Sequence, residues 1–376
     1  MAKLKPPDLT PEQQEYLARY GFDPELFRAW QEGVHKGTLN RKNNAVTTPL
    51  LAPDPGSVHD LPRKNSKSHA TLVHLGTEAI RRGELGMVVL NGGMATRFGG
   101  VVKGVVDVLG PGRSFLALNV EDLQHAAKEC GGRIQLFLMN SFATDQATRA
   151  HFAEHHDFGL PADQVHMYTQ FISMRLEKDG NLFVGKDGQP SFYGPGHGDF
   201  APALRRSGLL QRFLDQGGKH LFVCNVDNLG ARISPLLLGS HIHSGAECTV
   251  ELAPKWPGDV GGSPYSFEGR VQLVEQVRYP EGFDPDIVDV FNTNTFHFSA
   301  AALNRDFDLA YYYVEKKVEG RPAVQMERLI GEMTRHLSTN FVKVKRTGVD
   351  TRFLPIKTPE DLSAARADIL AIYGGS

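Results

Sequence analysis

The stretch Met87–Gly104, MVVLNGGMATRFGGVVKG, decides the fold class. Its first four residues are apolar and predict a short buried strand, after which Asn91–Gly93 opens a glycine-rich loop. Glycines let a bulky anion approach main-chain N–H groups, because no Cβ stands in the way. Arg97 and Lys103 add two cations at the rim of this loop. A strand that feeds such a loop at the carboxyl edge of a sheet is typical of a nucleotide site.

Two common phosphate-binding motifs are excluded by their spacing. A dinucleotide fingerprint needs G-x-G-x-x-G, which the glycine pairs at 92–93 and 99–100 do not supply. A P-loop needs a hydroxyl residue after its lysine, whereas Lys103 is followed by Gly104. For this segment taken alone, a glycine-rich turn with two solvated cations remains an alternative.

Composition bounds the class of protein. The 376 residues can bury a large core, as one α/β domain with extensions or as two domains. Lys+Arg 41 against Asp+Glu 43 gives a formal charge of −2, so no global basic field recruits nucleic acid. No apolar run approaches the ~20 residues that cross a bilayer, and the start lacks the apolar core of a secretory signal. The three cysteines are far apart and form no C-x-x-C pair, which is typical of reduced thiols in a cytoplasmic protein. With the charge and the apolar runs, this predicts a cytoplasmic protein that has no nucleic-acid or membrane partner.

Strand-like and helix-like segments alternate along the chain. Strands are predicted near 136–139, 221–224, 247–252 and 270–277, and helices near 144–156 and 235–245. Helices also begin at the capping box Thr10–Gln13, after Asp23-Pro24 and after Thr358-Pro359. One helical stripe predicts a core helix and consists of Met326, Leu329, Ile330, Met333 and Leu337. The alternation favours a doubly wound, mostly parallel α/β sheet.

Two polar clusters stand where such a sheet would present its carboxyl edge. In Gly194–Asp199, three glycines surround His197, so the loop can wrap a ligand while the imidazole donates a hydrogen bond to phosphate. Asp227 follows the apolar strand 221–224, and Mg²⁺ prefers few carboxylates together with substrate phosphates and water. The alternatives are a structural histidine and an aspartate that forms a turn or caps a helix.

Two further clusters suit a sugar and a phosphate. Asn292 and Asn294 offer amide donors and acceptors to sugar hydroxyls, and Glu275 could accept from the same sugar, although asparagines also satisfy backbone at strand ends. Lys357 follows an apolar strand and precedes a helix cap, which would aim its ammonium group inward. Lysines are mostly solvated, so this motif is weak by itself.

Together these segments resemble the UTP-dependent sugar-1-phosphate uridylyltransferases, especially the UTP–glucose-1-phosphate uridylyltransferase (UDP-sugar pyrophosphorylase, UDPGP) family. The resemblance spans roughly Val88–Leu370 and rests, in order, on LNGGMATRFGG with Lys103, NSFATDQATRAHF, GPGHGD, NVDNLGA, FNTNTF and RFLPIKTPEDL. It implies a GT-A-like, Rossmann-related nucleotidyltransferase fold. Because the chain ends soon after PIKTPEDL, we expect no carboxyl-terminal β-helix domain.

The resemblance also assigns expected roles to individual residues. The nucleotide would contact Leu90, Gly92, Gly93, Gln170 as the uracil-reading glutamine, Gly198 and Asn225. The sugar and its phosphate would contact His197, Gly262, Glu275, Asn292 and Asn294. Asp227 would bind Mg²⁺, and the phosphates would be neutralised by Lys103, Lys357 and Arg97.

The glycine-rich loop departs from the family pattern. The family loop is GGxGT with a proline before its lysine, whereas this chain has Met94-Ala95-Thr96 and Val102. The loss of a glycine at Ala95 changes backbone freedom and leaves the pose of the triphosphate open. The stretch Lys103–Val108 is similar to the N-acetylhexosamine uridylyltransferases, but those tend to carry asparagine where His197 stands. The GHG motif therefore favours the glucose-type branch.

The resemblance implies three regions and one reaction. Residues 1–67 would form a helical extension and linker, 68–345 the catalytic domain, and 346–376 a strand–helix segment that contributes Lys357. The expected reaction is UTP + glucose 1-phosphate = UDP-glucose + diphosphate. The alternatives are the same reaction with an N-acetylhexosamine or galactose 1-phosphate, a non-catalytic UDP-sugar-binding protein and, more distantly, a nicotinamide oxidoreductase. The oligomeric state stays open.

Overall fold

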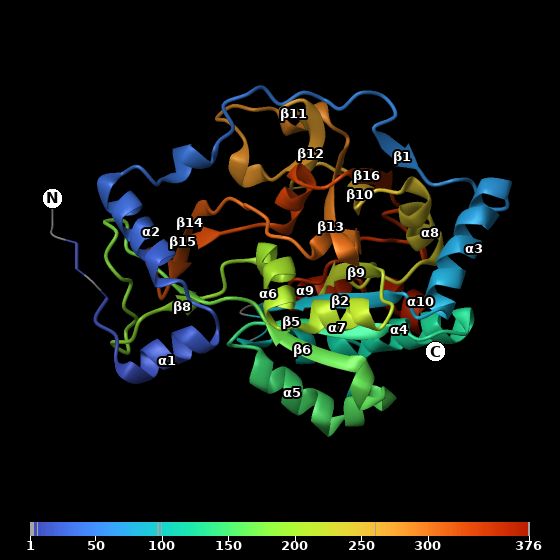
Figure 1. The fold of residues 1–376 in the computed structure, drawn as a ribbon, viewed down its shortest axis with the longest axis horizontal. Coiled ribbons are helices and arrows are strands. Elements are labelled where there is room, and N and C mark those ends of the chain that lie inside the picture. Colours follow the sequence, from blue (N-terminus) through green and yellow to red (C-terminus); the bar gives the residue numbers. More distant parts are fainter. Residues whose placement is uncertain (1–3, 6, 96–97, 99, 260, 375–376) are drawn as a thin grey trace.

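A central eight-stranded sheet organises the molecule (Figure 1). The computed structural model describes residues 4–5, 7–95, 98, 100–259 and 261–374. In spatial order the strands are β1 (Val58–Asp60), β16 (Thr339–Lys343), β10 (Cys248–Pro254), β13 (Val290–Ser299), β9 (His220–Asn225), β2 (Leu85–Asn91), β5 (Gln135–Asn140) and β6 (Val165–Thr169). All neighbouring pairs are parallel except the two that β13 makes, with β10 and β9. The prediction of a mostly parallel sheet is confirmed.

Strand β2 lies at the centre of the core. All seven of its residues are buried, as expected for a parallel strand covered on both faces. Val88 and Leu90 pack into the cluster on one face of the sheet, while Met87 and Val89 pack into the cluster on the other. The apolar run that predicts this strand therefore reflects two packed faces.

Helices cover both faces, which confirms the doubly wound arrangement. One face packs against α3 (Lys67–Arg81), α4 (Phe115–Cys130), α5 (Asp145–Glu154), α8 (Pro235–Ser244) and α10 (Arg366–Tyr373). The other face packs against α6 (Phe200–Arg206) and α7 (Leu209–Asp215), which lie in front of the sheet in Figure 1. Helices α3 and α8 touch through glycines, because a Cβ on Gly76 or Gly239 would lie within 2 Å of a carbonyl oxygen of the opposite helix. Only glycine allows this approach.

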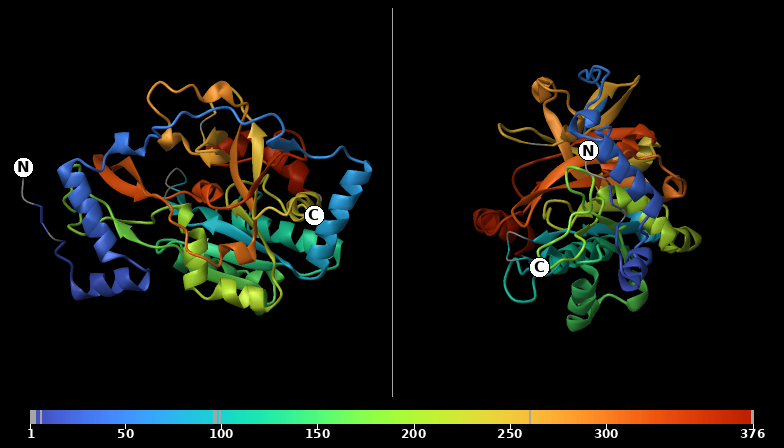
Figure 2. Two further views of the ribbon diagram at one scale, coloured as in Figure 1. Left: turned by 45° about the horizontal axis from the view of Figure 1, so that its top comes forward. Right: turned by 90° about the vertical axis from the view of Figure 1, so that its left-hand side faces the viewer.

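The amino-terminal helices pack against two hairpins at the left of Figure 1. Helix α1 (Pro11–Arg19) begins at the predicted capping box, and α2 (Pro24–Lys36) is capped by Asp23. They share a small apolar core with β7 (Ser173–Met174), β8 (Phe192–Tyr193), β14 (Tyr312–Val318) and β15 (Arg321–Glu327). Figure 2 shows that this group lies beside the main sheet rather than on one of its faces.

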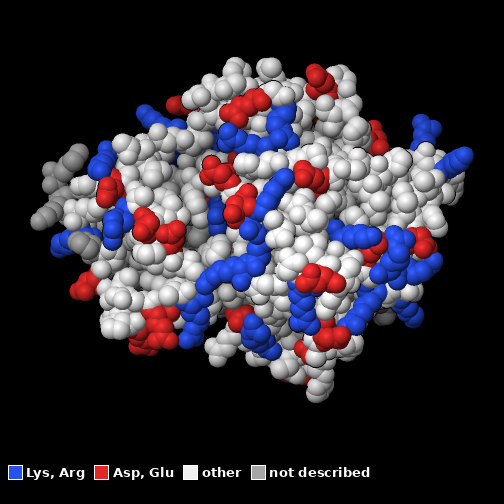
Figure 3. Space-filling model, viewed as in Figure 1, with Lys and Arg blue, Asp and Glu red and all other residues white. Residues whose placement is uncertain are grey.

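The remaining elements are short. Hairpin β3 (Met94–Ala95)/β4 (Val101–Val102) follows the glycine-rich loop, hairpin β11 (Ser263–Phe267)/β12 (Arg270–Val274) lies at the top of Figure 1, and α9 (Pro359–Ala364) precedes α10. None of the described helices is both long and apolar enough to cross a membrane. On the face in Figure 3, acidic and basic side chains alternate without a large patch of one sign.

The predicted helix over 326–337 is wrong. Met326 lies in β15 opposite Tyr313, while Ile330 and Met333 belong to a short 3₁₀ segment, Ile330–Arg335. Met326 packs into the amino-terminal cluster, whereas Ile330, Met333 and Leu337 pack into the core of the main sheet. The apolar residues are spaced as in a helix, but Met326 pairs within a hairpin and the other residues pack into a different apolar cluster. These tertiary contacts outweigh the local helical pattern.

Candidate active site

Polar residues gather at the carboxyl edge of the sheet. The parallel strands β2, β5, β6 and β9 all end at this edge, at Asn91, Asn140, Thr169 and Asn225. Strand β13 runs the opposite way, and its pairing with β9 begins only at Phe296. Its amino-terminal half therefore extends beyond the end of β9 and brings asparagines to the same edge. Such an edge is where open α/β sheets bind ligands.

The side chain of Gln170 lies between two glycine-rich loops. A Cβ on Gly92 would come within 2.8 Å of its amide nitrogen, and a Cβ on Gly194 within 2.0 Å. The Gln170 main-chain N–H donates to the carbonyl of Asn140 at 2.8 Å, which fixes the residue just past β6. The structure therefore brings together three sequence motifs that are far apart in the chain.

A buried network around Asn91 fixes the start of the glycine-rich loop. The Asn91 amide donates to Asn140 Oδ1 and to Thr148 Oγ1, each at 2.9 Å, and Thr144 donates to the Asn91 carbonyl. Sequence reasoning missed this role of Asn91. The available signal was the motif NSFATDQAT, which supplies all three partners from the end of β5 and the start of α5.

The residues that flank this network, Leu90 in β2 and Gly93 in the loop, also lie at the edge. Leu90 pairs with Asn225 across β2 and β9, so the expected nucleotide residues of the two strands are neighbours. Gly93 is exposed, and a Cβ placed on it would meet no atom within 4 Å. The loop therefore opens outward directly after the end of β2. Arg97 lies outside the described residues.

Lys103 and Asp227 form an ion pair. Lys103 Nζ lies 2.8 Å from Asp227 Oδ2, and both side chains are largely buried, with 11% and 20% of their surface exposed. Lys103 comes from the 3₁₀ turn Lys103–Val105 after β4, while Asp227 lies two residues beyond the end of β9. Two expected phosphate-site residues separated by more than a hundred positions thus converge.

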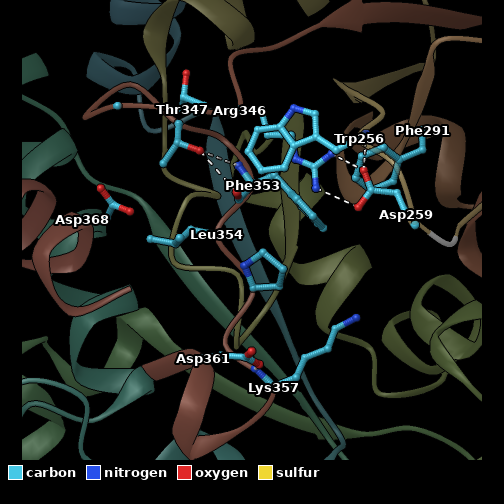
Figure 4. Close-up of a pocket in the computed structure, with 14 residues that line it drawn as sticks. Trp256, Asp259, Phe291, Arg346, Thr347, Phe353, Leu354, Lys357, Asp361 and Asp368 are labelled. Atoms are coloured by element: carbon cyan, nitrogen blue, oxygen red, sulfur yellow. Dashed lines mark hydrogen bonds and ion pairs between the residues drawn. The ribbon is translucent and has the colours of Figure 1, made fainter. Parts of the chain in front are cut away.

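Lys357 lies on the carboxyl-terminal segment, whose main chain contacts Asp227, but the cavity that it lines includes neither Lys103 nor Asp227. The main-chain N–H of Ile356 donates to the Asp227 carbonyl at 3.0 Å, and Pro355 forms a bridge with Asn228. Lys357 itself is exposed and lines a cavity of about 710 Å³ (Figure 4). In that view it lies with Asp361 at one end of the cavity, while Trp256, Arg346 and Asp259 lie at the other.

His197 is held in one tautomer. The main-chain N–H of Ile330 donates to His197 Nδ1 at 3.0 Å, so the ring proton of the neutral imidazole must sit on Nε2. Burial lowers the pKa of His197 to about 4, despite the opposing effect of Glu327. At neutral pH the ring is therefore uncharged, with Nε2–H available as a hydrogen-bond donor.

Arg328 clamps the loop that carries His197. Its guanidinium bonds Asp199 at 2.5 Å, and its main chain exchanges hydrogen bonds with Pro195 and Gly198. A Cβ on Gly198 would lie 2.7 Å from the Arg328 carbonyl carbon, so glycine is needed there. Sequence reasoning missed Arg328, because no local signal connects it with a loop so distant in the chain.

Four asparagine and glutamate side chains form a continuous hydrogen-bonded row. Asn294 donates to Asn225 Oδ1 at 2.9 Å, the Asn294 main chain donates to Asn292 Oδ1, and Asn292 donates to Glu275 Oε1 at 3.3 Å. The Asn292 N–H also bonds the Gly262 carbonyl at 2.8 Å. The row therefore runs from the end of β9, beside Asp227, to the hairpin β11/β12.

An irregularity in β13 creates this arrangement. Leu252 pairs with Asn292 and Val250 with Phe296, so three residues of β13 face one residue of β10. Within this bulge Asn294 has a left-handed backbone with φ of 57°. Bulges re-aim side chains, and here the bulge directs the amide of Asn294 toward β9.

Glu275 titrates unusually. Burial and the nearby Glu332 raise its pKa to about 7, although Asn292 and the Gly262 N–H favour the charged form. Gly262 and Gly331 both pack against its carboxylate, since a Cβ on either would come within 2.6 Å of an oxygen. Gly331 directly follows Ile330, the partner of His197, so the His197 loop and the Glu275 row are adjacent.

Asp227 and Asn225 are the residues beside the Lys103 pair that could hold a divalent cation. The Asp227 carboxylate is partly exposed and paired with Lys103, and Asn225 Oδ1 accepts a hydrogen bond from Asn294. Carboxylate and amide oxygens are ligand types that Mg²⁺ takes together with phosphates and water.

Known proteins resemble this chain in sequence and in fold. The sequence profile of the family described as UTP–glucose-1-phosphate uridylyltransferase matches residues 54–375. The UTP–glucose-1-phosphate uridylyltransferase of Hordeum vulgare is 32% identical over 308 residues, which cover 78% of this chain and 63% of that protein. The chain thus spans less than two thirds of the length of this relative.

Solved structures share the fold. The UDP-N-acetylglucosamine pyrophosphorylase of Trypanosoma brucei superposes with a TM-score of 0.77 at 20% identity, over 94% of this chain and 79% of that chain. The UDP-glucose phosphorylase of the same organism gives 0.73 at 22% identity, over 94% and 77%. These similarities confirm the nucleotidyltransferase fold. With the profile match across most of its length, the chain belongs to the UTP–glucose-1-phosphate uridylyltransferase family.

Proposed function

We propose that the protein is a uridylyltransferase that converts UTP and glucose 1-phosphate into UDP-glucose and diphosphate. The observation that supports this most is a row of contacts at the sheet edge, from Asn225 through Asn294 and Asn292 to Glu275. The Lys103–Asp227 ion pair lies two residues beyond Asn225 along the chain. A charged group suited to a triphosphate thus lies beside a row of amides suited to sugar hydroxyls.

The proposed reaction needs no protein nucleophile. An oxygen of the sugar phosphate, already ionised at neutral pH, attacks the α-phosphorus of UTP. A new P–O bond forms on one side as the bond to the bridging oxygen of the β-phosphate breaks on the other, and diphosphate leaves with that electron pair. The protein then contributes alignment of the two phosphates and compensation of developing negative charge.

Lys103 and Asp227 would act on the phosphates. We propose that Asp227, with Asn225 beside it, holds Mg²⁺, which would neutralise phosphate oxygens when bound. Lys103 is paired with this same carboxylate. On substrate binding, Lys103 would exchange Asp227 for a phosphate oxygen, and Lys357 with Arg97 would approach the same triphosphate. The main-chain bond between Ile356 and Asp227 supports this placement of Lys357.

The neutral groups would orient the two substrates. Gln170, whose side chain lies between two glycine loops, would bond the uracil edge. Leu90, Gly92, Gly93 and Gly198 would contact the nucleoside. His197 would donate from Nε2 to a phosphate oxygen, which its tautomer supports. The sugar would be held by Gly262, Glu275, Asn292 and Asn294.

The sugar is tested by competition. The protein is incubated with UTP, Mg²⁺ and equal amounts of glucose, galactose and N-acetylglucosamine 1-phosphates, and the nucleotide products are identified by mass spectrometry. We expect UDP-glucose to dominate. If another UDP-sugar dominates, the protein is still a uridylyltransferase, but its preferred substrate is that sugar 1-phosphate rather than glucose 1-phosphate. Tight binding of UDP-glucose without any product would instead support a non-catalytic UDP-sugar-binding protein.

A further inference from the structure

Three side chains of the kinds that can ligate a metal cluster at the carboxyl end of α5. His151, Glu154 and His155 each offer one donor atom, and the three atoms lie within 4.8 Å of one another. Their spacing of i, i+3 and i+4 places them on one face of the helix. They form the only such group of at least three potential ligands in the described part of the chain.

Neighbouring groups hold both imidazole rings in place. His151 Nε2 lies 2.7 Å from Ser114 Oγ, the capping residue of α4. When Nε2–H donates to this oxygen, Nδ1 keeps a free lone pair, as in metal sites where a second partner fixes the histidine tautomer. The rings of His151 and His155 lie 4.6 Å apart, and His155 stacks on Phe158 at 5.1 Å.

The chain turns sharply to provide that stacking partner. His156, Asp157 and Phe158 all have left-handed backbones, with φ of 51–52°. Three consecutive non-glycine residues in this conformation are unfavourable by themselves. The turn brings the Phe158 ring against the His155 ring. Each histidine of the cluster therefore has a neighbour that restrains its ring, Ser114 for His151 and Phe158 for His155.

We propose that His151, Glu154 and His155 bind a divalent transition-metal ion, with Zn²⁺ as the representative case. Imidazole ligands suit Zn²⁺, Ni²⁺, Co²⁺ and Cu²⁺, whereas Mg²⁺ prefers oxygen ligands. Three protein ligands leave a fourth tetrahedral position for water. The ligands of this site differ from the residues proposed to hold Mg²⁺ at Asp227.

The test is a calorimetric titration of the full-length protein with Zn²⁺ in the presence of excess Mg²⁺. We expect one site in the wild type. His155→Ala should weaken its affinity at least ~10-fold, and Glu154→Gln should weaken it by a smaller factor. The matched control is His125→Ala on the neighbouring α4, where one histidine faces one glutamate, Glu129, at 3.3 Å. This control should bind as the wild type does.

The outcomes separate a built site from surface adsorption. Loss of the site in His155→Ala but not in His125→Ala supports the proposal. Absence of binding in the wild type, an unchanged affinity in His155→Ala, or equal losses in both variants would overturn it. Circular dichroism checks that His155→Ala is folded, and Glu154→Gln, which keeps the side-chain size, gives an independent answer if it is not.

Discussion

At the residue scale, the two lysines proposed to contact the phosphates, Lys103 and Lys357, differ in burial and in ion pairing. Lys103 is largely buried against Asp227, so its replacement would also leave a carboxylate without its partner. Lys357 is exposed, and its ammonium group forms no ion pair with any residue that the structure describes. Lys357 is therefore the better position at which to test charge compensation, because replacing its exposed side chain removes no ion pair of the described residues.

Lys357→Met should lower kcat by about 10²–10³-fold, the usual effect of removing one electrostatic contact to a transition state. The measurement is diphosphate release at saturating UTP and glucose 1-phosphate. Lys345→Met is the matched control, since Lys345 lies on the same segment with 69% of its side chain exposed and pairs with Asp350. Near wild-type turnover in Lys357→Met would remove this lysine from the mechanism.

The raised pKa of Glu275 predicts a pH-dependent cost in stability. The folded protein holds this proton up to about pH 7, whereas an ordinary glutamate releases it near 4.5. Between these values the folded state binds more protons than the unfolded state, so the free energy of unfolding falls as pH rises. Glu275→Gln removes this titration. The free energy of unfolding of the variant, measured relative to that of the wild type, should therefore rise by about 1–3 kcal/mol between pH 4.5 and pH 7.5.

This prediction is checked by urea unfolding at both pH values. Glu268→Gln, at the turn of the same hairpin and exposed beside Arg335, is the matched control for replacing a glutamate by glutamine in this hairpin. A Glu275→Gln difference that does not change with pH would mean that Glu275 has an ordinary pKa in the folded protein.

At the scale of elements, Arg346 fastens the connection between β10 and β11. Its guanidinium lies 3.8 Å from the centre of the Trp256 ring, binds Asp259 with both terminal nitrogens and donates to the Pro254 carbonyl at 2.7 Å. Figure 4 shows this group at the rim of the cavity. The connection leads directly to Gly262, so its position affects the proposed sugar site.

Arg346→Met should loosen this connection and lower kcat/KM for the sugar phosphate by up to ~10²-fold, because small misplacements of positioning groups are costly. Hydrogen exchange should quicken in residues 255–262 while the central strands stay protected. The control is Arg335→Met, which breaks a half-exposed pair with Glu268 at the far end of the hairpin. Unchanged exchange in Arg346→Met would show that the connection is held by other contacts.

At the scale of the whole molecule, the carboxyl-terminal segment is anchored to the sheet through a buried ion pair. Arg352 bonds both oxygens of Glu251, at 2.8 and 2.7 Å, and His297 approaches the same carboxylate at 3.2 Å. Burial alone would raise the pKa of Glu251, but Arg352 and His297 outweigh it and hold the value at about 2. This anchor, with the bond from Ile356, fixes the backbone that carries Lys357.

Arg352→Met should reduce the free energy of unfolding by about 3–5 kcal/mol, because it leaves a buried carboxylate without its partner. The double variant Glu251→Gln/Arg352→Met should recover much of this loss, since the uncompensated charge is then gone. Urea unfolding of the two variants measures both values. Equal destabilisation in the single and double variants would show that packing, rather than charge, dominates at this anchor.

The sequence predicts those features of the fold and the site that depend on neighbouring residues, and it does not predict those that depend on contacts between distant residues. Strands β2, β5 and β9 and the capped starts of α1, α2 and α9 are local signals, and the structure confirms them. The bulge at Asn294 and the clamp by Arg328 depend on partners distant in sequence, which a single chain does not reveal. The division into 1–67, 68–345 and 346–376 stays a prediction.

The central claim is that one site joins a uridylyl group to a sugar phosphate. Its most direct test is to incubate the protein with UTP, Mg²⁺ and glucose 1-phosphate and to quantify nucleotide and diphosphate together. The proposed chemistry predicts UDP-glucose and diphosphate in equal amounts, with neither formed when the sugar phosphate is omitted. Diphosphate release without the sugar phosphate, or no product at all from the folded protein, would contradict it.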